Sequence, residues 1–547
     1  MTTRIFTLIF CSLLLSFHFS WAQQAFSPGG EKPKVVIGVI VENMRPDYIQ
    51  RYWNTFGENG FKKLFSQGAV CTNVNLTHYF QNYASGTATL YTGTTPSLHG
   101  IVGKTWYDRN KSKEVECTVD DYYFTVGADT KFGNASPKQL LSTTITDNLK
   151  IFTHGKSLVF SAALNRESAI FSAGHSADGA YWFDPESGRM ISSSFYVSTF
   201  PGWVREFNNQ KYFERYTNQN WVLLLPGNFY TESLPDNYPL EKGYFEKWNT
   251  FPHNIRKYVK AAENFSPLKS TPYGNELMKN FAIALLDNEP VGEDEYTDFV
   301  SFTFSSMDDK NNLFGPASLE MQDNYLYLDK YLAELIAHAE NRFGKQNVLF
   351  FLTANTSASY PVDYLKEKFN LPVNYFYPEN AMALLTSYLN VSYGEGKYIE
   401  HHSDCQVYLN HDLIKKSKLN LNDIREDAAG FINQFEGVQL SMPAHQLETG
   451  SSSNGLLSTL YKSYTKSRSG DFLYILKEGW QPTYKYHRVN YTDQSNIPLV
   501  FYGAGVRPQV ITEKYNAIDL VPTLSDLLHI PRPDKSQGIT ITPVLNK

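Results

Sequence analysis

The chain has 547 residues, of which 42% are hydrophobic and 19% charged, and its 55 acidic and 49 basic side chains leave a net charge of −6. Because it contains no basic run or stripe, the sequence argues against a nucleic-acid or anionic-membrane partner. An aromatic content of 15% excludes a disordered chain, and collagen-like, coiled-coil and disulfide-scaffold classes fail on composition as well. The length allows one elaborated α/β domain or about three or four smaller ones.

The N-terminus has the pattern of a signal peptide over residues 1–22. Arg4 supplies a positive start, Ile5–Phe19 form an apolar stretch, and Ser20-Trp21-Ala22 is a small-x-small cleavage site. The apolar stretch is short for a membrane span, and no second run of that length follows. We therefore expect an exported protein, periplasmic or secreted, whose mature chain begins near Gln23 and has no membrane span. An uncleaved anchor is the alternative.

Continuous apolar runs predict the strands of a parallel sheet buried on both faces. In chain order these runs are Lys34–Val41, Ser157–Ser161, Asp298–Phe304, Val348–Thr353 and Pro498–Tyr502. Helical patterns lie between them at Gly60–Gln67, Ala88–Gly93, Leu319–Glu340 and Leu520–Leu528. Alternating strands and helices predict an α/β fold with helices on both faces of the sheet.

One domain over 23–547 accounts for this order, with a cap insertion at about 185–290 and a smaller, β-rich excursion at about 375–485. The insertion is rich in Tyr, Trp, Asn and Pro and has weak periodicity. Sites in open α/β sheets lie beyond the carboxyl ends of the strands. We therefore expect functional residues just after Val41, Phe304 and Thr353 and in the loop near Tyr83.

Three cysteines remain once the signal peptide is removed. An odd count permits one disulfide, and Cys71 and Cys117 are the expected pair because both flank the same N-terminal α/β unit. Three isolated cysteines do not form a zinc motif.

A second group resembles metal ligands at first sight, comprising His401, His402, Asp404 and Cys405. It precedes the strand-like run Gln406–Leu409, and a polar hairpin is the preferred interpretation.

Several motifs, in order and at suitable spacing, identify a family resemblance. They are Val41–Arg45, Leu90–Ile101, Ala173–Phe183, Phe314–Pro316 with Glu320 and Asp323, Gly470-Asp471, Ile497–Gly503, Asp519 and Pro522-Thr523. The chain resembles the alkaline phosphatase superfamily, in particular the bacterial single-domain phosphomonoesterases related to type I phosphodiesterases and nucleotide pyrophosphatases. The resemblance implies a three-layer α/β sandwich. It also implies hydrolysis of phosphate esters by two zinc ions and a Thr or Ser nucleophile.

The ligand positions that the resemblance implies are largely replaced. One zinc site falls on Asp308, Asn312 and His487, and the other on Glu42, Asn355 and Thr356. Asn312, Asn355 and Thr356 are neutral oxygen donors, which zinc uses poorly. Since catalytic zinc takes three strong protein ligands, the second site is expected to be empty and the first to bind one zinc at most.

The nucleophile position falls on Tyr83, and the phosphate-binding positions fall on Lys104 and Arg166. A phenol has a pKa of about 10, so without a metal it is protonated at neutral pH. We expect Tyr83 to fill the space that metal and nucleophile vacate. Lys104 and Arg166 together suit a phosphate or sulfate group that is held and not cleaved. Glu42 is expected to pair with Lys104, and Asp308 with His487 or Arg166.

Three hypotheses remain open. The first is an inactive pseudophosphatase that binds an anionic ligand or a protein partner, with no metal cofactor. The second is an active hydrolase of phosphate esters that uses one zinc at Asp308 and His487 or another atypical arrangement. The third is a structural component of a surface complex, with residues 185–290 as the contact surface.

Overall fold

The computed structural model describes residues 32–307, 314–450, 455–483 and 495–545. Its compact unit is Pro33–Lys547. The predicted signal peptide and three of the predicted metal positions, Asp308, Asn312 and His487, lie outside the described residues. In the part of the chain that is described, no helix is long and apolar enough to cross a membrane.

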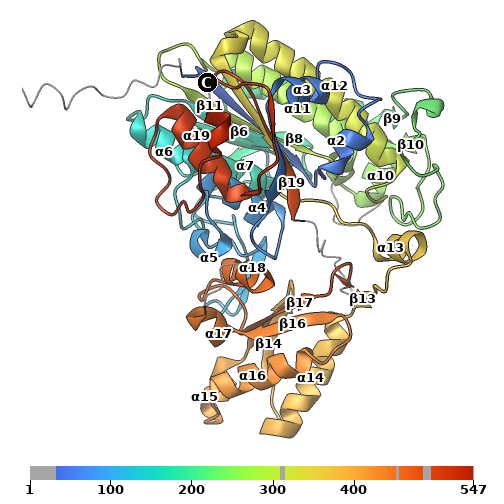
Figure 1. Cartoon of the computed structure of the whole chain (residues 1–547), viewed down its shortest axis with the longest axis vertical. Helices are drawn as coiled ribbons and strands as arrows, with labels where there is room; N and C mark the ends of the chain where they lie inside the picture. The colour runs from blue at the N-terminus through green and yellow to red at the C-terminus, as the bar shows by residue number, and fades with distance from the viewer. Residues whose placement is uncertain (1–31, 308–313, 451–454, 484–494, 546–547) are drawn as a thin grey trace, which may run out of the picture. The chain divides into compact units, whose positions relative to one another are not determined.

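A large sheet forms the centre of the fold (Figure 1). Along it lie β20 (Gln509–Ile511), β2 (Ala69–Asn75), β19 (Asn496–Gly503), β12 (Val348–Thr353), β1 (Val35–Glu42), β11 (Asp298–Ser305), β6 (Val159–Ala163), β7 (Gly179–Asp184), β8 (Arg189–Ser193) and β5 (Thr125–Val126), with β21 (Tyr515–Asn516) beside β2. The five strands from β12 to β7 are parallel. β19 pairs with β12 in the antiparallel direction, so the fifth predicted run is not part of the parallel set.

Helices cover both faces of this sheet, as Figure 1 shows. One layer contains α4 (Tyr83–Thr92), α6 (Ile145–Phe152), α7 (Arg166–Ala173) and α19 (Leu520–Leu528), and the other contains α3 (Phe61–Gln67), α11 (Pro272–Asn288) and α12 (Leu319–Phe343). β1 is buried along its whole length, as its unbroken apolar run predicts. The α/β three-layer fold with a mostly parallel sheet is confirmed.

The remaining helices and strands join these layers. They are α2 (Asp47–Arg51), α5 (Pro96–His99), β3 (Thr105–Asp108), β4 (Lys113–Glu116), α8 (Gly202–Asn209), α9 (Tyr212–Thr217), β9 (Asn220–Trp221), η1 (Gly227–Phe229), β10 (His253–Asn254), α10 (Ile255–Ala262), η2 (Ser266–Ser270), η3 (Lys345–Asn347), α13 (Val362–Phe369), η4 (Ala517–Asp519) and α20 (Thr542–Leu545). β3 and β4 form a hairpin, which carries two residues of the candidate site.

Residues 375–482 build a second, antiparallel sheet with its own hydrophobic core. Its order is β14 (Ile399–Ser403), β15 (Gln406–Leu409), β17 (Phe472–Leu476) and β16 (Val438–Pro443), while β13 (Tyr375–Phe376) pairs with β18 (Gln481–Pro482). The helices of this region are α14 (Pro378–Tyr393), α15 (His411–Lys416), α16 (Leu421–Ile432), α17 (Ala444–Thr449) and α18 (Gly455–Ser463). β14 and β15 confirm the hairpin predicted around His401 and His402.

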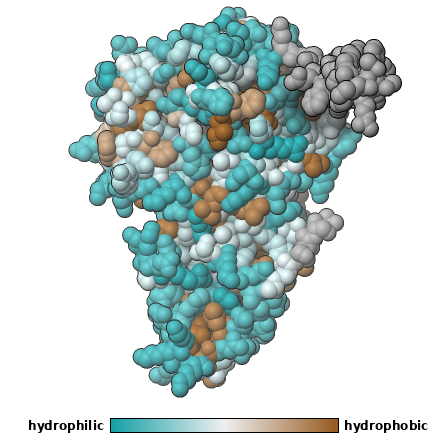
Figure 2. All heavy atoms as spheres, turned by 90° about the vertical axis from the view of Figure 1, so that its left-hand side faces the viewer, coloured by the Kyte–Doolittle hydropathy of each residue, from teal (hydrophilic) through white to brown (hydrophobic). Residues whose placement is uncertain are grey.

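The surface view shows a largely hydrophilic face with separate apolar patches (Figure 2). Most large apolar side chains are instead buried in the core around the main sheet or in the smaller one beneath β17.

The predicted disulfide is absent. Cys71 and Cys117 are both free, and all three cysteines, Cys405 included, are buried. Cys71 on β2 packs into the main core, whereas Cys117, just after β4, belongs to a smaller cluster beside α4 and α7. The two thiols are therefore held apart by the packing of separate hydrophobic clusters.

Candidate functional site

The site begins where β1 ends. Glu42, the last residue of the strand, is completely buried, and its backbone carbonyl accepts hydrogen bonds from the backbone and side chain of Ser306. Asn43 follows with φ of 60°, a left-handed conformation that Asn tolerates better than most residues. The chain therefore turns sharply off the sheet at its carboxyl edge, where α/β folds place their sites.

Hydrogen bonds from α7 hold the Glu42 carboxylate. Asn165 Nδ2 donates to one oxygen at 2.6 Å, and Ser168 Oγ donates to the other at 2.5 Å. Asn165 immediately precedes α7 and Ser168 lies three residues further on, so both can face the same carboxylate. Lys269 Nζ donates to Asn165 Oδ1 at 2.6 Å, which fixes the orientation of the amide.

Asn43 links Tyr83 to the loop after β12. Its amide nitrogen donates to the Tyr83 hydroxyl at 2.8 Å, and its amide oxygen accepts from the Thr356 hydroxyl at 2.8 Å. Tyr83 is the first residue of α4, which Asn82 and Ser85 cap in a capping box. Asn43 lies within the motif Val41–Arg45, but neither its residue type nor its spacing marks it as a site residue.

Asn355 reaches α4 through a close backbone contact. A Cβ on Gly86 would overlap the Asn355 carbonyl oxygen, so only glycine lets the loop approach the helix this closely. The Asn355 side chain then donates to Thr87 Oγ1 at 3.0 Å. Four predicted positions, Glu42, Tyr83, Asn355 and Thr356, are therefore brought together at one edge of the sheet.

The two predicted phosphate-binding cations lie together but are engaged by carboxylates. Lys104 Nζ is 3.4 Å from Glu167, and Arg166 forms ion pairs with Glu167, at 3.6 Å, and with Glu116. Burial alone would raise the pKa of Glu167, but Lys104 and Arg166 lower it to about 2. The predicted pair between Glu42 and Lys104 is therefore wrong. Lys104 pairs with Glu167, because the Glu42 carboxylate faces Asn165 and Ser168. Asp308, the other predicted partner of Arg166, lies outside the described residues.

The exposure of these groups differs. The Arg166 side chain is 3% exposed and Glu167 is 5% exposed, whereas Lys104 and Glu116 are 44% and 45% exposed. Arg166 also stacks over the Phe132 ring, 4.8 Å from its centroid. The buried pair is therefore fixed in place, while Lys104 and Glu116 have room to move.

Two hydroxyl groups of α4 each contact an imidazole, but both hydroxyls are too buried to act as a nucleophile. Ser85 Oγ is 3.1 Å from His78 Nε2, and Thr89 Oγ1 is 3.1 Å from His99 Nε2. All four side chains are buried, and Ser85 also bonds the backbone of Asn82 in the helix cap. We interpret both pairs as structural.

The described residues do not fit a zinc ion at the second predicted site. Zinc needs lone pairs from deprotonated carboxylates or imidazoles, but Asn43 and Asn355 direct amide N–H donors toward Tyr83 and Thr87. Of the described ligand positions only Glu42 offers a carboxylate. Within the described ranges, no three His, Cys, Asp or Glu side chains are grouped to hold a metal.

Comparison with known proteins places this site in a family. The model of the type I phosphodiesterase/nucleotide pyrophosphatase family matches residues 36–497. The chain is 34% identical to alkaline phosphatase PhoV of Synechococcus elongatus, over 94% of this chain and 93% of that protein. It is also 34% identical to alkaline phosphatase PafA of Elizabethkingia meningoseptica, over 94% and 95%. The crystal structure of wild-type PafA superimposes with a TM-score of 0.88 at 33% identity, covering 94% of this chain and 99% of that one. The chain therefore belongs to the type I phosphodiesterase/nucleotide pyrophosphatase family of the alkaline phosphatase superfamily.

Proposed function

We propose that this protein is a pseudophosphatase, which binds a phosphate-like anion without hydrolysing its ester. The observation that carries the proposal is the hydrogen-bonded chain Tyr83–Asn43–Thr356, which lies where the family has its nucleophile and a zinc ligand. Amide and hydroxyl groups satisfy one another here. No step of two-metal phosphoryl transfer can be assigned to these side chains, because none of the three is a strong metal ligand.

The Glu42 carboxylate supports the same conclusion. A buried carboxylate is expensive unless it is hydrogen-bonded or paired, and Asn165 and Ser168 meet that requirement in place of a metal. Lys269 adds a positive charge one contact away, on Asn165. These hydrogen bonds offset part of the cost of burying the Glu42 carboxylate.

Anion binding is assigned to Lys104 and Arg166. Glu167 is buried and cannot leave, but Glu116 lies on β4 with its side chain 45% exposed. An incoming phosphate or sulfate can displace the Glu116 carboxylate from the Arg166 guanidinium. The same anion can then bind the Lys104 ammonium group from the solvent side. Lys104 and Arg166 therefore form the proposed anion site, in which the ligand exchanges with the Glu116 carboxylate.

The place of action follows from the N-terminal pattern. We propose export through the signal peptide at residues 1–22, with the mature protein acting in the periplasm or outside the cell. A phosphate- or sulfate-bearing molecule, or a protein partner carrying such a group, is the proposed ligand.

A second candidate function is an active phosphate-ester hydrolase. The observation that favours it is the 34% identity to PhoV and PafA, both named alkaline phosphatases, over nearly the whole chain. In that case Asp308 and His487, or another atypical arrangement, would hold a single zinc. Zinc would supply a Lewis acid for the phosphoryl oxygen.

Zinc content and turnover separate the two candidates. The purified protein is dialysed against micromolar zinc, its metal is measured by elemental mass spectrometry, and phosphate monoesters and diesters are tested as substrates. The pseudophosphatase predicts less than one zinc per chain and no turnover above a buffer blank. One or more zinc ions with zinc-dependent turnover would establish the hydrolase instead.

Phosphate binding is tested separately by calorimetry on Glu116→Gln. Removing the competing carboxylate should raise phosphate affinity roughly fivefold, because a half-exposed ion pair contributes up to about 1 kcal/mol. Glu114→Gln is the matched control, since Glu114 lies on the same strand and its side chain is also 45% exposed. Equal phosphate affinity in the wild type and Glu116→Gln would show that Arg166 is not part of the anion site.

A further inference from the structure

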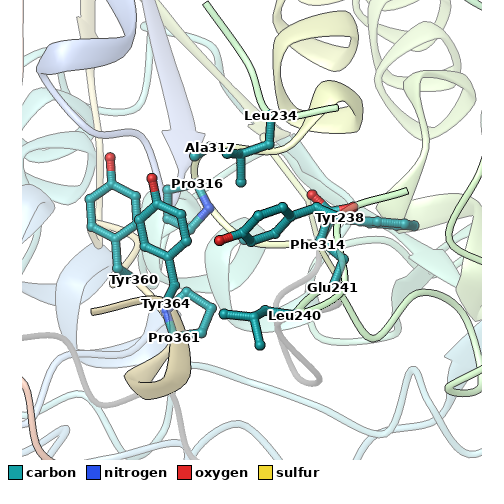
Figure 3. Close-up of a pocket in the computed structure, with 11 residues that line it drawn as sticks. Leu234, Tyr238, Leu240, Glu241, Phe314, Pro316, Ala317, Tyr360, Pro361 and Tyr364 are labelled. Atoms are coloured by element: carbon teal, nitrogen blue, oxygen red, sulfur yellow. The ribbon is translucent and has the colours of Figure 1, made fainter. Parts of the chain in front are cut away.

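The cavity beside Glu241 is too small for an organic ligand. Tyr238, Tyr360 and Tyr364 line it (Figure 3), and the space that admits the centre of a water molecule is about 10 Å³. A single water molecule needs about 10–15 Å³ by that measure. This cavity therefore holds one water molecule at most.

A much larger cavity lies at the edge of the central sheet, where the strand order ends with β8 and β5. We call it the β8–α8 groove. It is lined by residues 124–127, by Arg189 at the start of β8, and by residues 198–209, which lead into α8 and form one of its faces. The space in it for water is about 490 Å³. That volume falls within the range of about 300–1,000 Å³ that is typical of ligand pockets.

The groove exists because β5 is short. This strand has two residues and pairs only with Ser192 and Ser193 of β8. Further along β8, the Asn208 side chain takes the place of a strand: its oxygen accepts from the Met190 backbone N–H at 3.0 Å, and its nitrogen donates to the Met190 carbonyl at 2.9 Å. The backbone of Met190 is therefore already satisfied, and a ligand here is bound by side chains and not as an added strand.

Two phenylalanines give the groove an apolar surface. Phe200 is 8% exposed and packs against Tyr181, with ring centroids 6.2 Å apart. A Cβ on Gly127 would lie 2.1 Å from the Phe200 ring, so glycine lets the end of β5 approach this ring. Phe124 is 61% exposed, which leaves its ring available to a ligand. Phe200 thus forms a fixed wall, and Phe124 is an exposed ring beside it.

Two arginines, and no acid, are among the described residues that line the groove. Arg205 Nη1 donates to the Phe200 carbonyl oxygen at 2.7 Å, which holds the guanidinium beside residues 198–200. The Arg189 side chain is exposed. Neither guanidinium forms an ion pair with a carboxylate in the described part of the chain, whereas Arg109 and Arg166 are each paired with one. The groove therefore combines two uncompensated positive charges with apolar rings.

We infer that the β8–α8 groove binds an organic anion that carries a phosphate or sulfate group on an apolar body. The anionic group lies against Arg189 and Arg205, and the apolar body covers Phe124 and Phe200. Guanidinium groups bind oxyanions through pairs of parallel N–H bonds. A phosphate or sulfate ester has three terminal oxygens to share between two guanidiniums, whereas a carboxylate has two.

Further donors lie beside the arginines. Ser198 and Thr199 line the groove, and their hydroxyls can donate to an oxyanion. Lys104 and Arg166, the proposed anion site near α7, do not line it. The inference is therefore independent of the proposed function.

Calorimetry on the full mature chain tests the inference with phenylphosphonate and benzenesulfonate, neither of which has an ester bond to cleave. Methylphosphonate keeps the anion without the ring, and benzyl alcohol keeps the ring without the charge. We expect at least one ring-bearing anion to bind with a dissociation constant of about 1 mM or below, and both truncated compounds to bind at least about tenfold more weakly. The ratio of the phenylphosphonate and benzenesulfonate affinities shows whether the groove prefers a phosphate or a sulfate group.

Variants assign the binding to this groove. Arg189→Gln and Arg205→Gln should each weaken the ring-bearing anion at least about fivefold, because each removes charge-assisted hydrogen bonds. Arg256→Gln, an exposed arginine of α10 that does not line the groove, is the matched control and should leave the affinity unchanged. Phe124→Leu should weaken phenylphosphonate but not methylphosphonate. Circular dichroism confirms that each variant is folded.

The outcomes separate this groove from the first anion site. No binding of either ring-bearing anion up to about 20 mM would overturn the inference, and so would equal affinity for phenylphosphonate and methylphosphonate. Binding that responds to Glu116→Gln but not to Arg189→Gln or Arg205→Gln would place the anion at Lys104 and Arg166 and also overturn it. Loss of binding in the two groove variants supports the inference whether or not phosphate binds at the first site.

Discussion

Asp471 is a buried carboxylate on which one substitution has a large predicted effect. It is completely buried just before β17 and accepts hydrogen bonds from Arg109 at 2.8 Å, Arg425 at 2.6 Å, His411 at 2.8 Å and the backbone N–H of Leu409 at 2.8 Å. Burial alone would raise the pKa of Asp471, but His411, Arg109 and Arg425 lower it well below its ordinary value. The carboxylate therefore ties α15, α16 and the β3–β4 hairpin to the second sheet.

Asp471→Asn keeps the shape of the side chain and removes its charge. Removing one partner of a buried ion pair costs about 3–5 kcal/mol. The Arg109 and Arg425 side chains are 26% and 13% exposed, so water partly compensates them and the lower limit applies. We expect a loss of about 3 kcal/mol in the free energy of unfolding.

The pH dependence follows from the direction of the pKa shift. A carboxyl whose pKa is depressed in the folded state stabilises the protein above its unfolded pKa, about 3.9 for Asp, and this contribution is lost as pH falls further. The difference between wild type and Asp471→Asn should therefore shrink as the pH falls below about 4.

Urea unfolding, followed by fluorescence and circular dichroism, measures the effect. Glu436→Gln, an exposed acid of the same region, is the control and should change stability by less than about 0.5 kcal/mol. Arg109 lies in the hairpin that carries Lys104 and Glu116, so Asp471→Asn should also weaken phosphate binding. A loss of less than about 1 kcal/mol would refute the assignment of Asp471 as a buried ionic centre.

Three further predictions concern single residues. Tyr83→Thr alone should give no phosphatase turnover above wild type, since the loop after β12 still lacks strong metal ligands; zinc-dependent turnover in this variant would contradict that reading. Burial raises the pKa of Cys71 to about 12, so Cys71 and Cys117 should react with a thiol reagent only after unfolding, and reduction should leave the mass of the native protein unchanged. Burial raises the pKa of Glu241 in the folded state only, so the unfolded chain alone ionises this residue as pH rises from 5 to 9, and wild type should lose stability over that range. Glu241→Gln should reduce this loss, and thermal unfolding at each pH measures it; parallel curves for the two proteins would contradict the burial of an ionisable group here.

Five strands of the central sheet were predictable because their signal is local, whereas others, such as β2 and β7, were not predicted. β1 and β12 are unbroken apolar runs between polar segments, and the ends of these runs place the strands within a residue of their observed bounds. α12 and α19 were predictable for the same reason. The antiparallel direction of β19 was not, since an apolar run does not specify which neighbour it pairs with.

The candidate site was predictable only in part. The motifs identified the positions of Glu42, Tyr83, Asn355 and Thr356, and the structure brings these four together. The partners that decide their chemistry, such as Asn43 and Ser168, are common polar residues with no spacing that distinguishes them. Their role appears only when β1, β12, α4 and α7 converge at one edge of the sheet.

The sequence by itself determined the α/β class and the family resemblance. These are properties of residue type and local order. Only the tertiary structure decided that Lys104 pairs with Glu167, that Cys71 and Cys117 lie in separate cores, and that Glu241 faces an aromatic cavity. Pairing and burial depend on which distant segments meet, and that is set by the packing of the whole core.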